Sequence, residues 1–153
     1  MKVLLLTTAT GQGHNSAASA LSGRLRERGC EPVTKDILKS GRRNVSARVS
    51  GTYTAMVRHV PWFFGGLYHL GERVSSSRMH SPIYYLNSLY SDSFRRRLGE
   101  IAPDLIVCPH IFSAQALTFL REKGLSRTPA VAVMTDYTWS PFWEETRLDR
   151  YYI

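Results

Sequence analysis

Apolar residues occur along the chain in two patterns: short continuous runs, and longer segments in which they recur at helical spacing. A short continuous run is typical of a parallel strand that is covered on both faces. The runs KVLLLTT, DLIVC and AVAVM therefore predict strands over residues 2–8, 104–108 and 130–134. Two more strands are expected, over residues 32–37 and in the segment DRYYI, residues 149–153.

Alanine- and leucine-rich segments alternate with these strands. They predict helices over residues 16–29 and 112–123, each closed by a glycine. Asn15 or Ser16 can cap the first helix, because short polar side chains accept hydrogen bonds from the unpaired amides of its first turn. The alternation of strand, helix and strand predicts an α/β fold with right-handed crossovers, namely a Rossmann-like parallel sheet.

The alternation is broken between residues 44 and 100, where no strand is predicted. We interpret this segment as a helical insert in the sheet domain, with two or three helices. The length of 153 residues fits one domain that spans residues 1–153. The expected helices are residues 46–59, 62–74 and 81–100, interrupted by Pro61, by Gly65 and Gly66, and by Ser75–Ser77.

The insert carries most of the net positive charge. The chain has a formal net charge of +8 and a pI of about 9.9, which favours an anionic partner. Arginines and aromatic residues intermingle in the insert, and they form either a face for a membrane surface or lipid, or a helical subdomain with an aromatic core. Nucleic acid is not expected as a partner, because the insert has no helix-turn-helix or RNP-like pattern.

The cysteine content and the lack of long apolar runs indicate where in the cell the protein is expected. The chain has two cysteines, Cys30 and Cys108, without a pairing motif, which favours reduced thiols of a cytoplasmic protein. No signal peptide is visible, and no run approaches the ~20 apolar residues of a membrane-spanning helix. We therefore expect a soluble or peripheral membrane protein.

The segment TTATGQGHNSAASAL, residues 7–21, joins the first strand to the first helix. Gly11 and Gly13 allow a ligand to approach the backbone, and the helix N-terminus favours an anion. The spacing fits neither a dinucleotide fingerprint nor a Walker loop. At this helix N-terminus the neutral form of His14 is favoured, which suits a general base, although the ring can also simply hydrogen-bond the turn.

Two polar residues follow other predicted strands, at the edge where α/β folds bind ligands. Asp136 follows the strand over residues 130–134, and it either orients His14 or caps its own turn. His110 follows the strand over residues 104–108, and it either lines the same cleft or closes the turn after Pro109.

Other titratable residues receive no role. Glu144 and Glu145 are adjacent, and neighbouring carboxylates more often belong to a solvated loop or helix start than to acid–base chemistry. No metal site is predicted, because the remaining histidines lack ligand spacing: His59, His69 and His80.

Three motifs in order resemble one family. GQGHNSAASAL resembles the G-x-G-H-x-x-A-A-x-A-L signature of the monogalactosyldiacylglycerol synthase and processive diacylglycerol glucosyltransferase family. PDLIVCPHIFSAQAL is similar to a strand, loop and helix of that family, and TDYTWSPFWEET with LDRYYI resembles its T-D-[FY] motif. The resemblance covers nearly the whole chain.

The resemblance implies an inverting glycosyltransferase of the GT-B fold, which moves glucose or galactose from a UDP-sugar to diacylglycerol. The chain would be its N-terminal half, which binds the lipid acceptor and the inner face of the cell membrane. The implied donor is UDP-glucose or UDP-galactose, with no covalently bound cofactor. His14 would be the catalytic base supported by Asp136, with Gly11, Gly13 and Asn15 at the donor phosphates. Acceptor or membrane contacts are assigned to Trp62, Phe63, Phe64, His110 and Trp143.

Two departures from the family pattern qualify the expectation. Ser140 stands where many relatives have a histidine. The chain stops at Ile153, where the resemblance leads us to expect a C-terminal UDP-sugar domain to follow, and we expect no sugar transfer by this polypeptide alone. It is then a fragment, or an acceptor subunit that works with a partner chain. The alternative function is a non-catalytic Rossmann-like module that binds lipid or nucleotide.

Overall fold

A computed structural model of the chain describes residues 1–8, 12–37, 61–75, 79–88, 91–136 and 140–153. Five strands form one sheet in the order β2-β1-β3-β4-β5, and every neighbouring pair is parallel. This is the α/β, Rossmann-like sheet that the apolar runs predict, and each predicted strand is present. The strands are β1 (Lys2–Thr7), β2 (Glu31–Asp36), β3 (Leu105–Cys108), β4 (Ala130–Val133) and β5 (Arg150–Tyr152).

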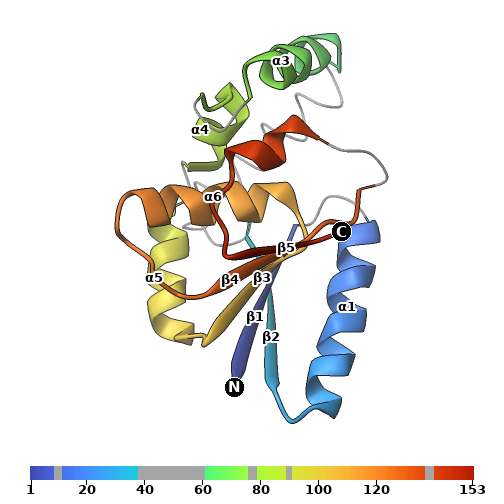
Figure 1. Ribbon diagram of the computed structural model, residues 1–153, viewed down its shortest axis with the longest axis vertical. Coiled ribbons are helices and arrows are strands. Elements are labelled where there is room, and N and C mark those ends of the chain that lie inside the picture. The colour runs from blue at the N-terminus through green and yellow to red at the C-terminus, as the bar shows by residue number, and fades with distance from the viewer. Residues whose placement is uncertain (9–11, 38–60, 76–78, 89–90, 137–139) are drawn as a thin grey trace.

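Helices cover both faces of the sheet (Figure 1). In that view α1 lies on one side, α5 and α6 lie on the other, and α3, α4 and the 3-10 helix η2 lie beyond α6. Among the described helices, none is long and apolar enough to cross a membrane. The helices are α1 (Gln12–Glu27), α3 (Pro61–Val74), α4 (Pro82–Ser88), α5 (Ser91–Ile101), α6 (Ile111–Glu122) and η2 (Pro141–Glu145).

The alternation of side chains along the strands divides the core in two. Leu4 and Leu6 of β1 face a large cluster with α5, α6 and η2, whereas Val3 and Leu5 face a smaller cluster with Leu21 and other residues of α1. The two cysteines are free, as expected. Burial on both faces explains why β1, β3 and β4 appear in the sequence as continuous apolar runs, whereas β2 and β5, at the two edges of the sheet, do not.

The helix boundaries differ from the predicted ones at two places. Helix α1 begins at Gln12, so neither Asn15 nor Ser16 is its N-cap, and His14 lies in the first turn. Helix α3 begins at Pro61 itself, one residue before the predicted start, and this first position suits the fixed φ and missing N–H of proline.

The number and extent of the helices in the insert also differ from the prediction. Gly65 and Gly66 lie inside α3, because its packing outweighs the ~1 kcal/mol that each glycine costs relative to alanine. The helix predicted over residues 81–100 is divided into α4 and α5. The helix predicted over residues 46–59 lies outside the described residues.

Gly71 is where α3 packs most closely on the domain. A Cβ atom at this position would lie 2.7 Å from Cε1 and 2.9 Å from Cζ of the buried Phe142 ring of η2. At Gly66, an exposed position on the same helix, a Cβ atom would meet nothing within 4 Å. The contact with η2 therefore requires a glycine at position 71.

The matched pair of variants tests this packing. Gly71→Ala is expected to lower the free energy of unfolding by about 1–3 kcal/mol, because the Phe142 ring must shift in a filled core. Gly66→Ala is expected to raise it by about 0.5–1 kcal/mol through helix propensity. Urea unfolding of both variants measures the difference, and equal stabilities would contradict the close contact.

Candidate active site

Three polar residues meet at the carboxyl ends of three strands. His14 lies in the first turn of α1 after β1, His110 directly precedes α6 after β3, and Asp136 follows β4. The chain leaves β1 toward β2 on one side and returns to β3 on the other, so β1 and β3 form the switch point of the sheet. Ligands of open α/β sheets bind outside the carboxyl ends of the strands at such a point.

His14 is held through its Nδ1 atom. This nitrogen lies 3.1 Å from the Pro109 carbonyl oxygen and 2.5 Å from Oγ1 of Thr135. The Thr135 hydroxyl in turn donates to the Pro109 carbonyl oxygen over 3.3 Å. The loops after β3 and β4 thus fix the His14 ring, whose side chain is 16% exposed.

The other ring nitrogen of His14 faces a carboxylate. Nε2 lies 3.8 Å from Oδ1 of Asp136, and the Trp143 indole N–H donates to Oδ2 of the same carboxylate over 3.5 Å. Asp136 therefore lies beside His14, as the first of the two sequence interpretations expects. At this distance the carboxylate stabilises an imidazolium by Coulomb attraction without capturing the neutral Nε2 in a hydrogen bond.

Trp143 supports the site from the core. Its side chain is 2% exposed and belongs to the large cluster beneath α6. The predicted contact of this ring with acceptor or membrane is thus not available in the structure, because the indole is enclosed by the domain. Its position is instead that of a hydrogen-bond donor that holds Asp136.

His110 closes the turn after Pro109, as one of its two interpretations expects, and its ring also contacts His14. It is the N-cap of α6, where its Nδ1 accepts the Phe112 backbone N–H over 3.1 Å, and its ring meets the His14 ring edge to face at 4.4 Å. Burial, together with the neighbouring His14, lowers the pKa of His110 to about 3. The ring is therefore neutral, and because Nδ1 accepts, its proton resides on Nε2.

The lowered pKa of His110 predicts a pH dependence of stability. The unfolded chain binds the proton below about pH 6.5 and the folded chain only near pH 3, so stability is full above 6.5 and is lost as the pH falls through this window. His110→Asn keeps a good N-cap and removes the titration. Between pH 7 and pH 5, wild type is expected to lose about 2 kcal/mol more than this variant in urea unfolding. Parallel losses would contradict the buried neutral ring.

The remaining predicted site residues lie around the start of α1 and at the start of α3. Gly13 and Asn15 lie exposed in the first turn of α1, where a Cβ atom at Gly13 would meet nothing within 4 Å. Gly11 lies outside the described residues, as do the side chains of the aromatic residues at the start of α3, namely Trp62, Phe63 and Phe64. Within the described ranges, no group of three or more His, Cys, Asp or Glu side chains is arranged to hold a metal ion.

Thr135 is a site residue that the sequence reasoning missed. It lies two residues after the end of β4 and directly before Asp136, and it is the threonine of the T-D-[FY] motif, which was the available signal. Its hydroxyl oxygen lies 2.5 Å from Nδ1 of His14, a shorter distance than those from the His14 ring to the Pro109 carbonyl oxygen and the Asp136 carboxylate.

Glu145 is the second missed residue, and it links the insert to the sheet domain. The side chain is 0% exposed, and its carboxylate accepts from the Ser81 backbone N–H (2.5 Å), the Ser81 hydroxyl (3.1 Å) and the Gln115 amide (2.7 Å). The sequence suggested a solvated pair, whereas only Glu144 is exposed. Glu145 instead ties the start of α4 to α6 and η2.

Of the comparisons with known proteins, one gave a match. No curated protein and no solved structure was found to match the chain. A family model described as monogalactosyldiacylglycerol (MGDG) synthase matches residues 14–153, from the first turn of α1 to the residue after β5. This match covers most of the chain and includes His14, His110 and Asp136. The chain therefore belongs to the monogalactosyldiacylglycerol synthase family.

Proposed function

We propose that this chain is the acceptor-binding domain of an inverting glycosyltransferase, the N-terminal half of a GT-B fold, which moves a hexose from a UDP-sugar to diacylglycerol. Membership of the family supports a glycosyltransferase that acts on diacylglycerol. The observation that carries the proposal is the position of His14 Nε2, at the switch point of the sheet and 3.8 Å from Asp136.

The site supplies a base of the required kind. In an inverting transfer, the acceptor hydroxyl oxygen attacks the anomeric carbon from the face opposite the diphosphate, and the bond to the diphosphate breaks. The hydroxyl proton passes to His14 Nε2, and the UDP leaves with the electron pair. The resulting imidazolium lies beside the Asp136 carboxylate, which stabilises the positive charge.

The start of α1 suits the departing diphosphate. The first backbone N–H groups of a helix have no partner within the helix, and the helix dipole favours negative charge there. Gly13 and Asn15 lie in this turn, and no side chain of the described residues fills the space at Gly13. UDP-glucose and UDP-galactose are the proposed donors, with the nucleotide held mainly by a C-terminal domain.

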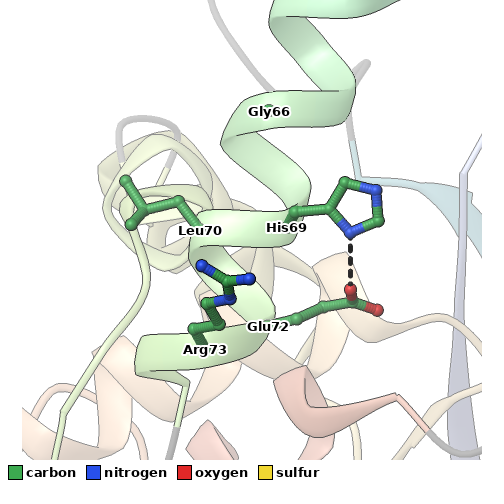
Figure 2. A pocket seen from close by; sticks show the side chains of 5 residues that line it. All are labelled: Gly66, His69, Leu70, Glu72 and Arg73. Atoms are coloured by element: carbon green, nitrogen blue, oxygen red, sulfur yellow. Dashed lines mark hydrogen bonds and ion pairs between the residues drawn. The ribbon is translucent and has the colours of Figure 1, made fainter.

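We place the domain on the inner face of the cell membrane, with the insert as its contact. Three of the exposed large apolar residues belong to the insert, namely Leu70, Met79 and Tyr85, each more than half exposed. On α3, Figure 2 shows Leu70 and Arg73 at an open pocket, while His69 is paired with Glu72. Exposed apolar groups beside arginines suit a bilayer with anionic headgroups.

Substitutions on the insert test the membrane contact. Leu70→Glu is expected to weaken partition into vesicles with anionic lipid about 10-fold, because it removes apolar burial and adds repulsion. Trp62→Ala combined with Phe63→Ala is expected to abolish co-sedimentation. Leu125→Glu, at an exposed leucine outside the insert, is the matched control and should bind as wild type does. Equal binding by all the variants would remove the insert from the membrane contact.

A transfer assay tests the function itself. The chain is fused to, or mixed with, a donor-binding domain of the same family and given radiolabelled UDP-glucose or UDP-galactose with vesicles that contain diacylglycerol. Glycolipid is expected only when both domains are present, because one domain alone does not orient donor and acceptor together. Formation of glycolipid by the 153-residue polypeptide alone would refute the proposal that a second domain is needed to bind the donor. Binding of lipid or nucleotide without product from any fusion would favour the non-catalytic module.

A further inference from the structure

We infer that Thr135 is a positioning residue that, with the Pro109 carbonyl, keeps the proton of the neutral His14 ring on Nδ1 and leaves Nε2 free to act as the base. The inference rests on the proposed function for its consequence, but its structural content concerns the resting protein. It assigns a role to the residue before Asp136, which is the threonine of the T-D-[FY] motif and received no role in the sequence analysis.

The contacts of Nδ1 determine where the proton resides. The Pro109 carbonyl oxygen, 3.1 Å away, only accepts, so a hydrogen bond to it requires a proton on Nδ1. The Thr135 hydroxyl donates to this same carbonyl over 3.3 Å, which turns its lone pairs toward His14. Both oxygens then accept from Nδ1–H, and the hydroxyl proton is satisfied by the carbonyl.

The opposite tautomer is disfavoured on both sides of the ring. With its proton on Nε2, the ring would leave Nδ1 facing the carbonyl oxygen lone pairs at 3.1 Å. Its Nε2–H would gain only a carboxylate at 3.8 Å, beyond hydrogen-bond distance. Because the partner of one ring nitrogen sets the state of the other, the Thr135 contact controls whether Nε2 has a lone pair for the acceptor proton.

His110 provides an internal reference for the measurement. Its Nδ1 accepts the Phe112 N–H, so its proton must be on Nε2. The two rings, whose centroids are 4.4 Å apart, are thus expected in opposite tautomers within one site. A single spectrum of the imidazole nitrogens reports both.

The experiment records long-range ¹H–¹⁵N spectra of the 153-residue chain with ¹⁵N-labelled histidine, above pH 7 and without ligands. His14→Asn and His110→Asn assign the signals. We expect His14 protonated on Nδ1 and His110 on Nε2. Thr135→Ser should keep the His14 pattern, whereas Thr135→Val, which has nearly the same shape without the hydroxyl, should shift His14 toward the Nε2–H form. Nε2–H in wild type, or an unchanged His14 pattern in Thr135→Val, would overturn the inference.

A second measurement separates this inference from the proposed function. In the two-domain transfer assay, Thr135→Val is expected to lower kcat about 10-fold with little change in the KM for the acceptor, and Thr135→Ser to restore it. If the tautomer shifts but kcat does not, the positioning role is refuted while transfer stands. If no fusion transfers sugar, the proposed function fails and the spectra still decide the tautomer. If Thr135→Val does not fold, Thr135→Ala replaces it in both measurements.

Discussion

Replacement of His14 by alanine is expected to lower kcat for glycolipid formation about 100- to 10,000-fold, which is the usual contribution of a general base. In the proposed function, Nε2 of this ring accepts the acceptor proton, and the Asp136 carboxylate 3.8 Å away stabilises the resulting charge. The variant should bind donor and acceptor nearly as well as wild type, because the lost interaction is made in the transition state.

The asparagine variant makes this test sharp. In His14→Asn, the amide can still donate toward the Pro109 carbonyl, but no basic nitrogen remains at the position of Nε2. We expect its kcat to be as low as that of His14→Ala while its thermal unfolding resembles wild type. Initial rates of the two-domain enzyme with a UDP-sugar and diacylglycerol provide the measurement. Activity of either variant within a few-fold of wild type would exclude His14 as the base.

Replacement of Glu145 by alanine is expected to lower the free energy of unfolding by about 3 kcal/mol, a large part of the stability of a domain of this size. The carboxylate accepts from two groups of Ser81 and from the Gln115 amide, and Gln115 in turn accepts from Asn87 over 2.6 Å. Truncation leaves these donors buried without an acceptor and also leaves a cavity.

The adjacent acid is the control for this substitution. Glu144 lies on the same turn of η2 and is exposed, so Glu144→Ala is expected to change stability by no more than about 0.5 kcal/mol. Glu145→Gln should lie between the two, because it keeps one acceptor oxygen but directs an amide N–H toward another donor. Urea unfolding of the three variants at pH 7 measures the series. Equal loss from Glu144→Ala and Glu145→Ala would show that the buried network contributes nothing specific.

The sheet was predictable from the sequence, whereas part of the site was not. Continuous apolar runs such as those of β1 and β4 have no polar interruption that shifts their boundaries, so each strand was found within a few residues. The start of α1 was misplaced because two glycines and a histidine resemble a loop. Local propensity at this position is outweighed by the attachment of His14 to the loops after β3 and β4.

The missed residues share one physical cause. Thr135 and Glu145 have roles that depend on partners 121 and 64 residues away, His14 and Ser81, and a single sequence contains no sign of such pairings. Asp136 and His110 were found because a strand end is a local feature that topology brings to one edge. Trp143 was predicted to contact the acceptor or the membrane. The sequence around Glu144 and Glu145 does not show which side chains of this turn are buried.

The position of the insert has a consequence for how the chain acquires its sheet. The Lys2 backbone N–H donates to Asp104, 102 residues later, and β1 pairs with β3 beside this contact. During synthesis, β1 therefore cannot pair with β3 until most of the chain has been made. The entropic cost of closing a loop grows only with the logarithm of its length, by about 0.6 kcal/mol per doubling. The long segment between β1 and β3 therefore lowers the stability of the folded chain only slightly, and its main effect is to slow folding. Until then, one edge of β1 is open to pairing with other nascent chains.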